Sequence, residues 1–360
     1  MTLRAVTLLY APRLRNAKKG AIMKIISNIP TPAEVKKKYP LTSAARQIKT
    51  SRDADLTDII TSASQKFLLI IGPCSADNPD ALNTYTARLS AIQKTTSDKI
   101  LILPRVYTQK PRTFAQGYMG IFHHPNPTAP PNLVEGIFAL RHIHHLILEN
   151  HGLTTADELL YPDLYPYIDD LVSYFAIGAR SVENQLHRFV ASGIDAPVGM
   201  KNPISGSMAA MFNSITAATR AHRFMYRGQE VQTSGNPMTH AILRGYRDHG
   251  ENHPNYHIEN LLDASRRYEQ SNLPHPCIIV DVSHSNSDKN YLSQPAAAME
   301  IIASRKACEA LGAIKGLMLE SYLRDGQQAP GGSIFGKSLT DPCLGWGKTE
   351  EFINKLHEAL

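Results

Sequence analysis

Short apolar runs alternate with longer amphipathic stretches along most of this 360-residue chain. Several longer stretches have helical periodicity, whereas most of the short runs are continuously apolar, which is typical of strands buried on both faces of a parallel sheet. Eight such runs separated by helices predict a closed (β/α)8 TIM barrel, and a doubly wound sheet is the alternative. The candidate strands are residues 67–71, 100–103, 153–160, 175–177, 197–200, 223–226, 277–282 and 316–319.

Helix start signals lie between candidate strands at two places. Asn78 precedes Pro79, and this pair predicts a helix start because asparagine caps the first turn and proline fits its first position. Asn132 and Glu135 mark a second start, after which apolar residues recur at helical spacing until Gly152.

The first 33 residues contain no acidic residue, and basic residues are spread through an otherwise apolar stretch that ends at Met23. This composition fits a transit peptide or, better, a translation start upstream of the true one. Thr31 and Glu34 then have the spacing of a capping box. We expect an N-terminal arm over residues 1–60, with 1–22 disordered or an upstream start, and a barrel over 61–360 that carries an extra hairpin.

Composition excludes several classes of protein. No apolar run approaches the roughly 20 residues of a membrane-spanning helix, and the four cysteines lack the close spacing of a disulfide framework or zinc ribbon. The net charge of +6 is scattered and interleaved with acidic residues, which argues against nucleic acid binding. A cytoplasmic enzyme with an anionic substrate fits best.

Ionisable residues follow the candidate strands. Because a TIM barrel gathers its active site at the carboxyl ends of its strands, these side chains should lie together. So many charges at one rim imply bound ions of both signs, since unpartnered charges are costly to bury. The residues are Cys74, Arg105, Glu158, Arg180, Lys201, His284 and Glu320, with Arg244 after a further apolar run at 241–243.

The segment 105–113, RVYTQKPRT, places three cations directly after a strand. Pro111 restricts its own backbone and that of Lys110, so Lys110 and Arg112 have limited freedom. A preorganised cluster of this kind suits a phosphorylated substrate. A solvated basic loop is the alternative reading of the segment alone.

The ionisable residues sort into two chemical groups. Cys74, His284, Glu320 and Asp341 could supply a thiolate, an imidazole and two carboxylates to one divalent metal, a set that suits Mn, Fe, Co, Zn or Cu. Alone, each could equally be a buried or capping residue. The second group could clamp a substrate that carries both phosphate and carboxylate, and its members are Arg105, Arg180, Lys201 and Arg244.

Eight strings carry a resemblance that runs in order from about residue 28 to the C-terminus. They resemble the motifs of the microbial type I 3-deoxy-D-arabino-heptulosonate-7-phosphate (DAHP) synthases. This family has (β/α)8 barrels and condenses phosphoenolpyruvate with erythrose 4-phosphate at the entry to the shikimate pathway. The strings are LIIGPCS (69–75), RVYTQKPRT (105–113), AIGAR (176–180), PVGMKN (197–202), TSGN (233–236), ILRG (242–245), DVSHSN (281–286) and GKSLTD (336–341).

The resemblance implies a role for each residue. Cys74, His284, Glu320 and Asp341 would be the metal ligands. Phosphoenolpyruvate would bind to Arg105, Arg180, Lys201 and Arg244, oriented by Glu158, and erythrose 4-phosphate to Lys110, Pro111, Arg112 and Thr113. Lys110 is the candidate for proton transfer to the new alkoxide, with Glu158 or a metal-associated water as competitors.

Two departures from the family pattern concern regulation. Tyr161 stands where the family has an acidic residue, and the stretch between Phe224 and Thr233 is shorter than in feedback-regulated members. Both segments shape the family's effector site, so we expect weak or absent inhibition by aromatic amino acids in a homodimer or homotetramer. A related phosphoenolpyruvate-dependent synthase and a non-catalytic barrel paralogue are the alternative functions.

Overall fold

Eight parallel strands form the centre of the protein in a computed structural model that describes residues 23–112 and 117–360. They run in the order β2-β1-β12-β11-β8-β5-β4-β3, and a bridge between Arg105 and Ala156 joins the two end strands. The predicted TIM barrel is confirmed. The strands are β1 (Phe67–Gly72), β2 (Ile100–Pro104), β3 (Thr155–Glu158), β4 (Val172–Ile177), β5 (Val198–Lys201), β8 (Thr239–Leu243), β11 (Ile278–Asp281) and β12 (Ile314–Glu320).

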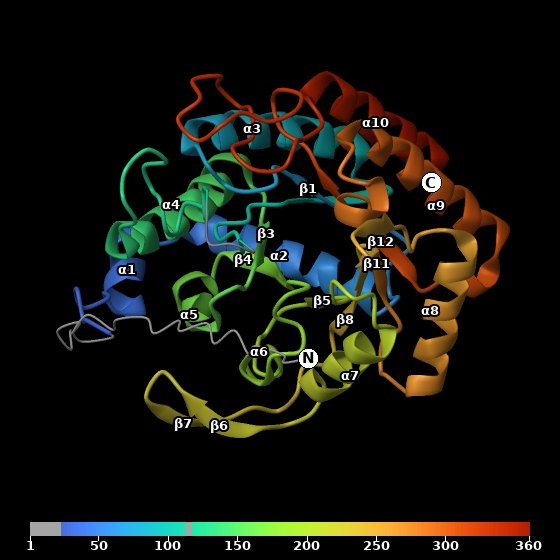
Figure 1. Ribbon diagram of the computed structural model, residues 1–360, viewed down its shortest axis with the longest axis horizontal. Helices are drawn as coiled ribbons and strands as arrows, with labels where there is room; N and C mark the ends of the chain where they lie inside the picture. The colour runs from blue at the N-terminus through green and yellow to red at the C-terminus, as the bar shows by residue number, and fades with distance from the viewer. Residues whose placement is uncertain (1–22, 113–116) are drawn as a thin grey trace, which may run out of the picture.

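One predicted barrel strand was wrong. The segment Arg223–Tyr226 is β6, which pairs with β7 (Gln229–Gln232) in a separate two-stranded antiparallel hairpin. Its residues alternate between exposed and half-buried, whereas those of β8 are all buried. The sixth barrel strand is therefore β8, which contains the apolar run before Arg244. The hairpin projects from the barrel in Figure 1.

Helices surround the barrel, as Figure 1 shows along its axis. The predicted starts are confirmed, because the side chains of Asn78 and Asn132 cap α3 and α4, and Thr31 and Glu34 form the capping box of α1. The helices are α1 (Pro32–Lys38), α2 (Ser43–Ile60), α3 (Pro79–Thr96), α4 (Leu133–His151), α5 (Tyr165–Ile168), α6 (Gln185–Ala191), α7 (Met208–Ala218), α8 (Ile258–Ser271), α9 (Gln294–Ala307) and α10 (Trp346–Ala359).

A packed core fills the barrel and continues into α2, which lies behind the strands in Figure 1. Leu56 and Ile59 of α2 belong to the same buried cluster as the inward-facing residues of the strands. Tyr174 donates a hydrogen bond to His240 inside the barrel, and a Cβ atom at Gly199 would lie 2.3 Å from the Tyr174 hydroxyl. The barrel is thus closed at this end, and a ligand must enter from the other.

A second hairpin that the sequence patterns did not predict follows β8. It consists of β9 (Tyr246–Asp248) and β10 (Glu251–His253), with Gly250 in the left-handed region at its turn. In the described part of the chain, no helix is both long and apolar enough to cross a membrane. The division of the chain at residue 60 remains a prediction, and residues 1–22 lie outside the described ranges.

Candidate active site

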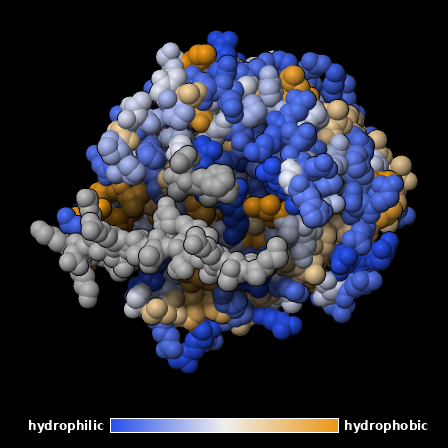
Figure 2. Space-filling model, viewed as in Figure 1, coloured by the Kyte–Doolittle hydropathy of each residue, from blue (hydrophilic) through white to orange (hydrophobic). Residues whose placement is uncertain are grey.

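A cavity of about 630 Å³ opens at the carboxyl ends of the barrel strands. Figure 2 is hollowed near its centre, where hydrophilic residues gather. The cavity brings together residues that are up to 231 positions apart in the chain. The cavity-lining residues that the sequence analysis predicted are Lys110, Pro111, Arg112, Glu158, Arg180, Lys201, Arg244, His284 and Asp341.

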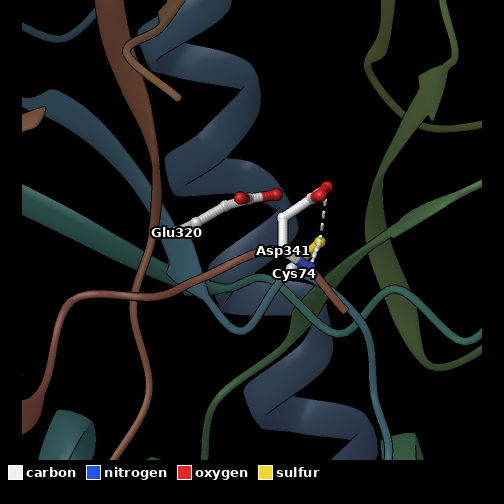
Figure 3. A group of neighbouring side chains, drawn as sticks. All are labelled: Cys74, Glu320 and Asp341. Atoms are coloured by element: carbon white, nitrogen blue, oxygen red, sulfur yellow. Dashed lines mark hydrogen bonds between the residues drawn. The ribbon is translucent and has the colours of Figure 1, made fainter. Parts of the chain in front are cut away.

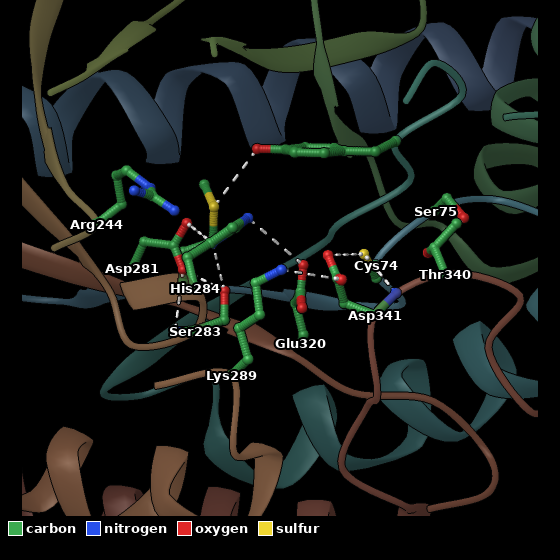
Figure 4. A network of polar contacts seen from close by, with 12 residues as sticks. Cys74, Ser75, Arg244, Asp281, Ser283, His284, Lys289, Glu320, Thr340 and Asp341 are labelled. Atoms are coloured by element: carbon green, nitrogen blue, oxygen red, sulfur yellow. Dashed lines mark hydrogen bonds and ion pairs between the residues drawn. The ribbon is translucent and has the colours of Figure 1, made fainter. Parts of the chain in front are cut away.

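Beneath the cavity, three potential metal ligands converge from three segments. One ligand atom each of Cys74, Glu320 and Asp341 lies within 4.8 Å of the others. Figure 3 shows these three side chains next to one another. The Cys74 thiol donates to Asp341 Oδ2 at 3.3 Å, and His284 Nε2 lies 3.9 Å from Glu320 Oε1. Figure 4 shows His284 beside this group, with Asp281 on its other side. The fold therefore gathers all four predicted ligands.

The donor set fits a divalent transition metal. In the described part of the chain, the buried Glu320 Oε1 accepts no hydrogen bond, although Arg105 Nη2 forms an ion pair with it at 3.1 Å. Burial raises the pKa of the Cys74 thiol to about 12, and burial also lowers the pKa of His284, which favours a neutral ring. A thiol, an imidazole and two carboxylates are donors that Mn, Fe, Co, Zn or Cu accept. A bound cation would displace the thiol proton.

The backbone of His284 is held in an unusual conformation. Its φ angle of 57° lies in the left-handed region, which is uncommon for residues other than glycine, although asparagine, aspartate and histidine adopt it more often than the rest. Asp281 Oδ2 contacts His284 Nδ1 at 3.0 Å and so orients the ring with Nε2 toward Glu320. Strain of this kind persists where the surrounding structure fixes a functional side chain.

Cationic side chains surround the rest of the cavity. Lys201 Nζ lies 3.2 Å from Asp281 and 3.9 Å from Glu158, so it is both buried and paired. Arg105 is fully buried, its guanidinium lies 3.8 Å from the centroid of the Tyr107 ring, and it pairs with Glu320. Burial opposes the charge of Arg105, but the attraction of Glu320 leaves its pKa raised.

Arg244 differs from these two cations. Its side chain is buried, yet in the described part of the chain no carboxylate oxygen lies within 4.0 Å of its nitrogens. Nη1 donates to Ser285 Oγ at 3.3 Å and to the Gly245 carbonyl at 3.5 Å. Burial lowers its pKa; the more distant Asp281 opposes this shift, and the repulsion of Arg180 adds to it. A buried cation without a close counter-ion is suited to binding an anion.

Lys110 links the two parts of the site. Its ammonium donates to Cys74 Sγ at 2.6 Å and to Asp341 Oδ2 at 3.3 Å. Burial opposes its charge, but the attraction of Cys74 and Asp341 leaves its pKa raised. Arg112 lies beyond it at the cavity wall, with Nε donating to the Tyr118 carbonyl. Thr113 lies outside the described residues.

Six cavity residues were not predicted as site residues: the apolar Ala179 and Ile204, and the polar Arg247, Asn252, Ser285 and Lys289. Ser285 and Lys289 follow β11 near His284, so the strand-end rule could have found them. Arg247 and Asn252 belong to the unpredicted β9–β10 hairpin, whose short strands carry no apolar pattern.

Comparison with known proteins places this site in a family. The model of the DAHP synthetase I family matches residues 36–354. The chain belongs to this family. It is 36% identical over 340 residues to the Tyr-sensitive phospho-2-dehydro-3-deoxyheptonate aldolase of Escherichia coli (strain K12), a match that covers 92% of each chain.

Two further members of the DAHP synthetase I family resemble the chain over nearly their whole length. The Trp-sensitive phospho-2-dehydro-3-deoxyheptonate aldolase of Enterobacter agglomerans is 35% identical over 355 residues, covering 96% of this chain and 97% of that one. A phospho-2-dehydro-3-deoxyheptonate aldolase structure from Francisella tularensis SCHU S4 superimposes with a TM-score of 0.87 at 28% identity, covering 94% and 98% of the two chains. The family predicted from the motifs is confirmed, and the predicted enzyme class, a 3-deoxy-7-phosphoheptulonate synthase, matches these names.

Proposed function

We propose that the protein condenses phosphoenolpyruvate with D-erythrose 4-phosphate to give DAHP and phosphate, the first step of aromatic amino acid biosynthesis. The observation that carries this proposal is one cavity with two kinds of site. The thiol, imidazole and carboxylate side chains of the predicted metal ligands lie beside the cationic side chains of the cavity. Lys110 contacts Cys74 of the first group and lines the cavity with the second.

Four cationic side chains would hold phosphoenolpyruvate, three of them buried and one, Arg180, exposed at the cavity. Arg105, Arg180, Lys201 and Arg244 supply the charge that its phosphate and carboxylate require, and arginine binds such groups through two parallel hydrogen bonds. Glu158, 3.9 Å from Lys201, would keep that ammonium in place before the substrate arrives. Phosphoenolpyruvate would supply the counter-ion that Arg244 lacks.

The second substrate would bind toward the cavity wall. Lys110, Pro111 and Arg112 line the cavity beside Asp341, and together with Thr113 they would receive the phosphate of erythrose 4-phosphate. This arrangement directs the aldehyde end of the sugar toward Cys74, His284, Glu320 and Asp341. One divalent metal held by these four residues would supply Lewis-acid polarisation of the aldehyde oxygen.

The reaction balances with the groups at hand. C3 of phosphoenolpyruvate attacks the aldehyde carbon and forms the new carbon–carbon bond, which leaves an alkoxide on the sugar and a cationic centre at C2. Water adds to C2, the C2–O bond to phosphate breaks as the C2 carbonyl forms, and the two protons of that water pass to the departing phosphate and to the Lys110 amine that has given up its own. Lys110, at the junction of the two subsites, would donate a proton to the alkoxide, with Glu158 as the competing donor.

The experiment that tests this function is a substrate panel. Purified protein with a divalent metal should consume phosphoenolpyruvate and release one phosphate for each molecule consumed, with the highest kcat/KM for erythrose 4-phosphate among aldose phosphates of four to six carbons. A higher kcat/KM for a five-carbon sugar phosphate would indicate the related synthase, and no turnover with any sugar would refute both. A homodimer or homotetramer in the cytoplasm remains our expectation.

A further inference from the structure

The β9–β10 hairpin contributes an asparagine to the rim of the cavity. Asn252 lies in β10, opposite Arg247 of β9, and both residues line the cavity with Arg244 and Ser285. None of the roles assigned above requires Asn252. Its side chain nevertheless takes part in a defined set of hydrogen bonds that leads to Arg244.

These hydrogen bonds form a directed chain. Asn252 Nδ2 donates to Asp288 Oδ1 at 2.6 Å, which fixes the orientation of the amide because a carboxylate only accepts. The Asn252 carbonyl oxygen then accepts from Ser285 Oγ at 3.0 Å. With its proton committed to Asn252, the Ser285 hydroxyl accepts from Arg244 Nη1 at 3.3 Å. Such chains polarise each member and strengthen one another.

The backbone around this chain is closely packed. Gly245 precedes the hairpin with φ of 72°, and a Cβ atom there would lie 2.7 Å from the Asn286 amide nitrogen and 2.8 Å from the His253 carbonyl oxygen. The rings of Tyr246 and His253 stack with centroids 5.0 Å apart. The hairpin is therefore fixed against the loop that carries Ser285, and Asn252 has little freedom to move away from it.

We propose that Asn252 is a positioning residue that orients the Arg244 guanidinium through Ser285 for the phosphoenolpyruvate anion. The inference rests on the proposed function, since it assigns Arg244 to that substrate. Ser285 and the Gly245 carbonyl are the hydrogen-bond partners of the Arg244 side chain in the described part of the chain. Loss of the Asn252 carbonyl would free the Ser285 hydroxyl to rotate and would leave the guanidinium less well oriented.

The test measures phosphoenolpyruvate binding by calorimetry, together with steady-state kinetics, on the full chain supplied with a divalent metal. Asn252→Ala should raise Kd and KM for phosphoenolpyruvate about fivefold to tenfold and change kcat less than about twofold. Ser285→Ala should raise Kd and KM for phosphoenolpyruvate by a similar factor and change kcat equally little. The double variant should be no weaker than Ser285→Ala, because both changes interrupt one chain.

Exchanging the amide and the carboxylate between positions 252 and 288 distinguishes an effect of this hydrogen-bond chain from a general effect on folding. Asn252→Asp alone should weaken binding, since two carboxylates would face each other at the present 2.6 Å contact. Asn252→Asp combined with Asp288→Asn should restore it, because donor and acceptor are merely exchanged. His249→Asn at the hairpin tip, where the side chain is 96% exposed, is the matched control and should bind as the wild type does.

Three results would overturn the proposal: unchanged Kd in Asn252→Ala, additive losses in the double variant, or no restoration by the exchange. A wild-type protein that binds no phosphoenolpyruvate would instead refute the proposed function, and the positioning role with it. A wild type that binds and turns over, with an unaffected Asn252→Ala variant, refutes the positioning role alone.

Discussion

Replacing Arg244 by methionine should stabilise the ligand-free protein while it weakens substrate binding. Arg244 is buried and makes two long hydrogen bonds, of 3.3 and 3.5 Å, without a carboxylate within 4.0 Å in the described part of the chain. Removing an ion from water costs several kcal/mol even after relaxation, whereas each such hydrogen bond contributes about 1 kcal/mol or less. Methionine fills a similar volume without charge.

The magnitudes follow from this difference. We expect Arg244→Met to increase the free energy of unfolding by about 1–2 kcal/mol, a value at the lower end of the stabilisation of about 1–4 kcal/mol that replacing buried ion pairs by apolar side chains can give. The same change removes a charge-assisted contact with phosphoenolpyruvate worth about 1.5–3 kcal/mol, so Kd should rise about tenfold to a hundredfold. Stability and binding should therefore change in opposite senses.

Denaturant unfolding of the ligand-free protein and calorimetric titration with phosphoenolpyruvate measure the two quantities. Arg266→Met is the matched control, because its side chain is 62% exposed on α8 and its nearest ion-pair contact with Asp263 is 3.7 Å long. That control should leave both quantities nearly unchanged. A destabilised Arg244→Met variant would show that the guanidinium is well compensated in the free protein, and an unchanged Kd would remove Arg244 from the substrate site.

Four further predictions concern other parts of the molecule. Cys74→Ala and His284→Ala should each bind divalent metal at least about tenfold more weakly and lose activity while circular dichroism stays native; full activity in protein shown to be metal-free would contradict this. Arg112→Ala should raise KM for erythrose 4-phosphate by about tenfold or more and leave that for phosphoenolpyruvate nearly unchanged, and equal changes in both constants would remove the assignment of separate subsites. Burial lowers the pKa of His240 to about 4, so the folded protein resists its protonation; stability should fall as pH decreases from about 6.5 toward 4, by up to about 3 kcal/mol, and urea unfolding of His240→Gln should lack this loss. Feedback inhibition by phenylalanine, tyrosine and tryptophan should be weak or absent, because Tyr161 offers no negative charge to an amino acid ammonium; inhibition at low micromolar concentrations would contradict this.

The sequence predicted seven of the barrel strands because most of them are buried on both faces and appear as apolar runs; β3, with the sequence TADE, is the exception and was found only within the longer run 153–160. The failure at residues 223–226 has a physical cause. Phe224 and Tyr226 face the core while Met225 is 79% exposed, so a hairpin strand produced an apolar run as dense as that of a barrel strand. Pairing partners, which distinguish the two cases, are not contained in a four-residue pattern.

The candidate site was predictable for a different reason. Parallel barrel strands end at one rim, so residues as distant as Cys74 and Asp341 meet without any local spacing signal. Arg247 and Asn252 could not be found in this way, because their positions depend on a hairpin held by tertiary contacts at Gly245 and Tyr246. Side-chain hydrogen bonds of this kind have no periodic pattern in the sequence.

The measurement that tests the proposed condensation most directly follows the methylene carbon of phosphoenolpyruvate. The protein, supplied with a divalent metal, is incubated with [3-¹³C]phosphoenolpyruvate and erythrose 4-phosphate, and the products are examined by ¹³C NMR. We predict that the label appears at C3 of DAHP, as a methylene bonded to a carbinol carbon, with one phosphate released per labelled product. Label found only in the methyl group of pyruvate, or remaining in phosphoenolpyruvate, would contradict the formation of the carbon–carbon bond.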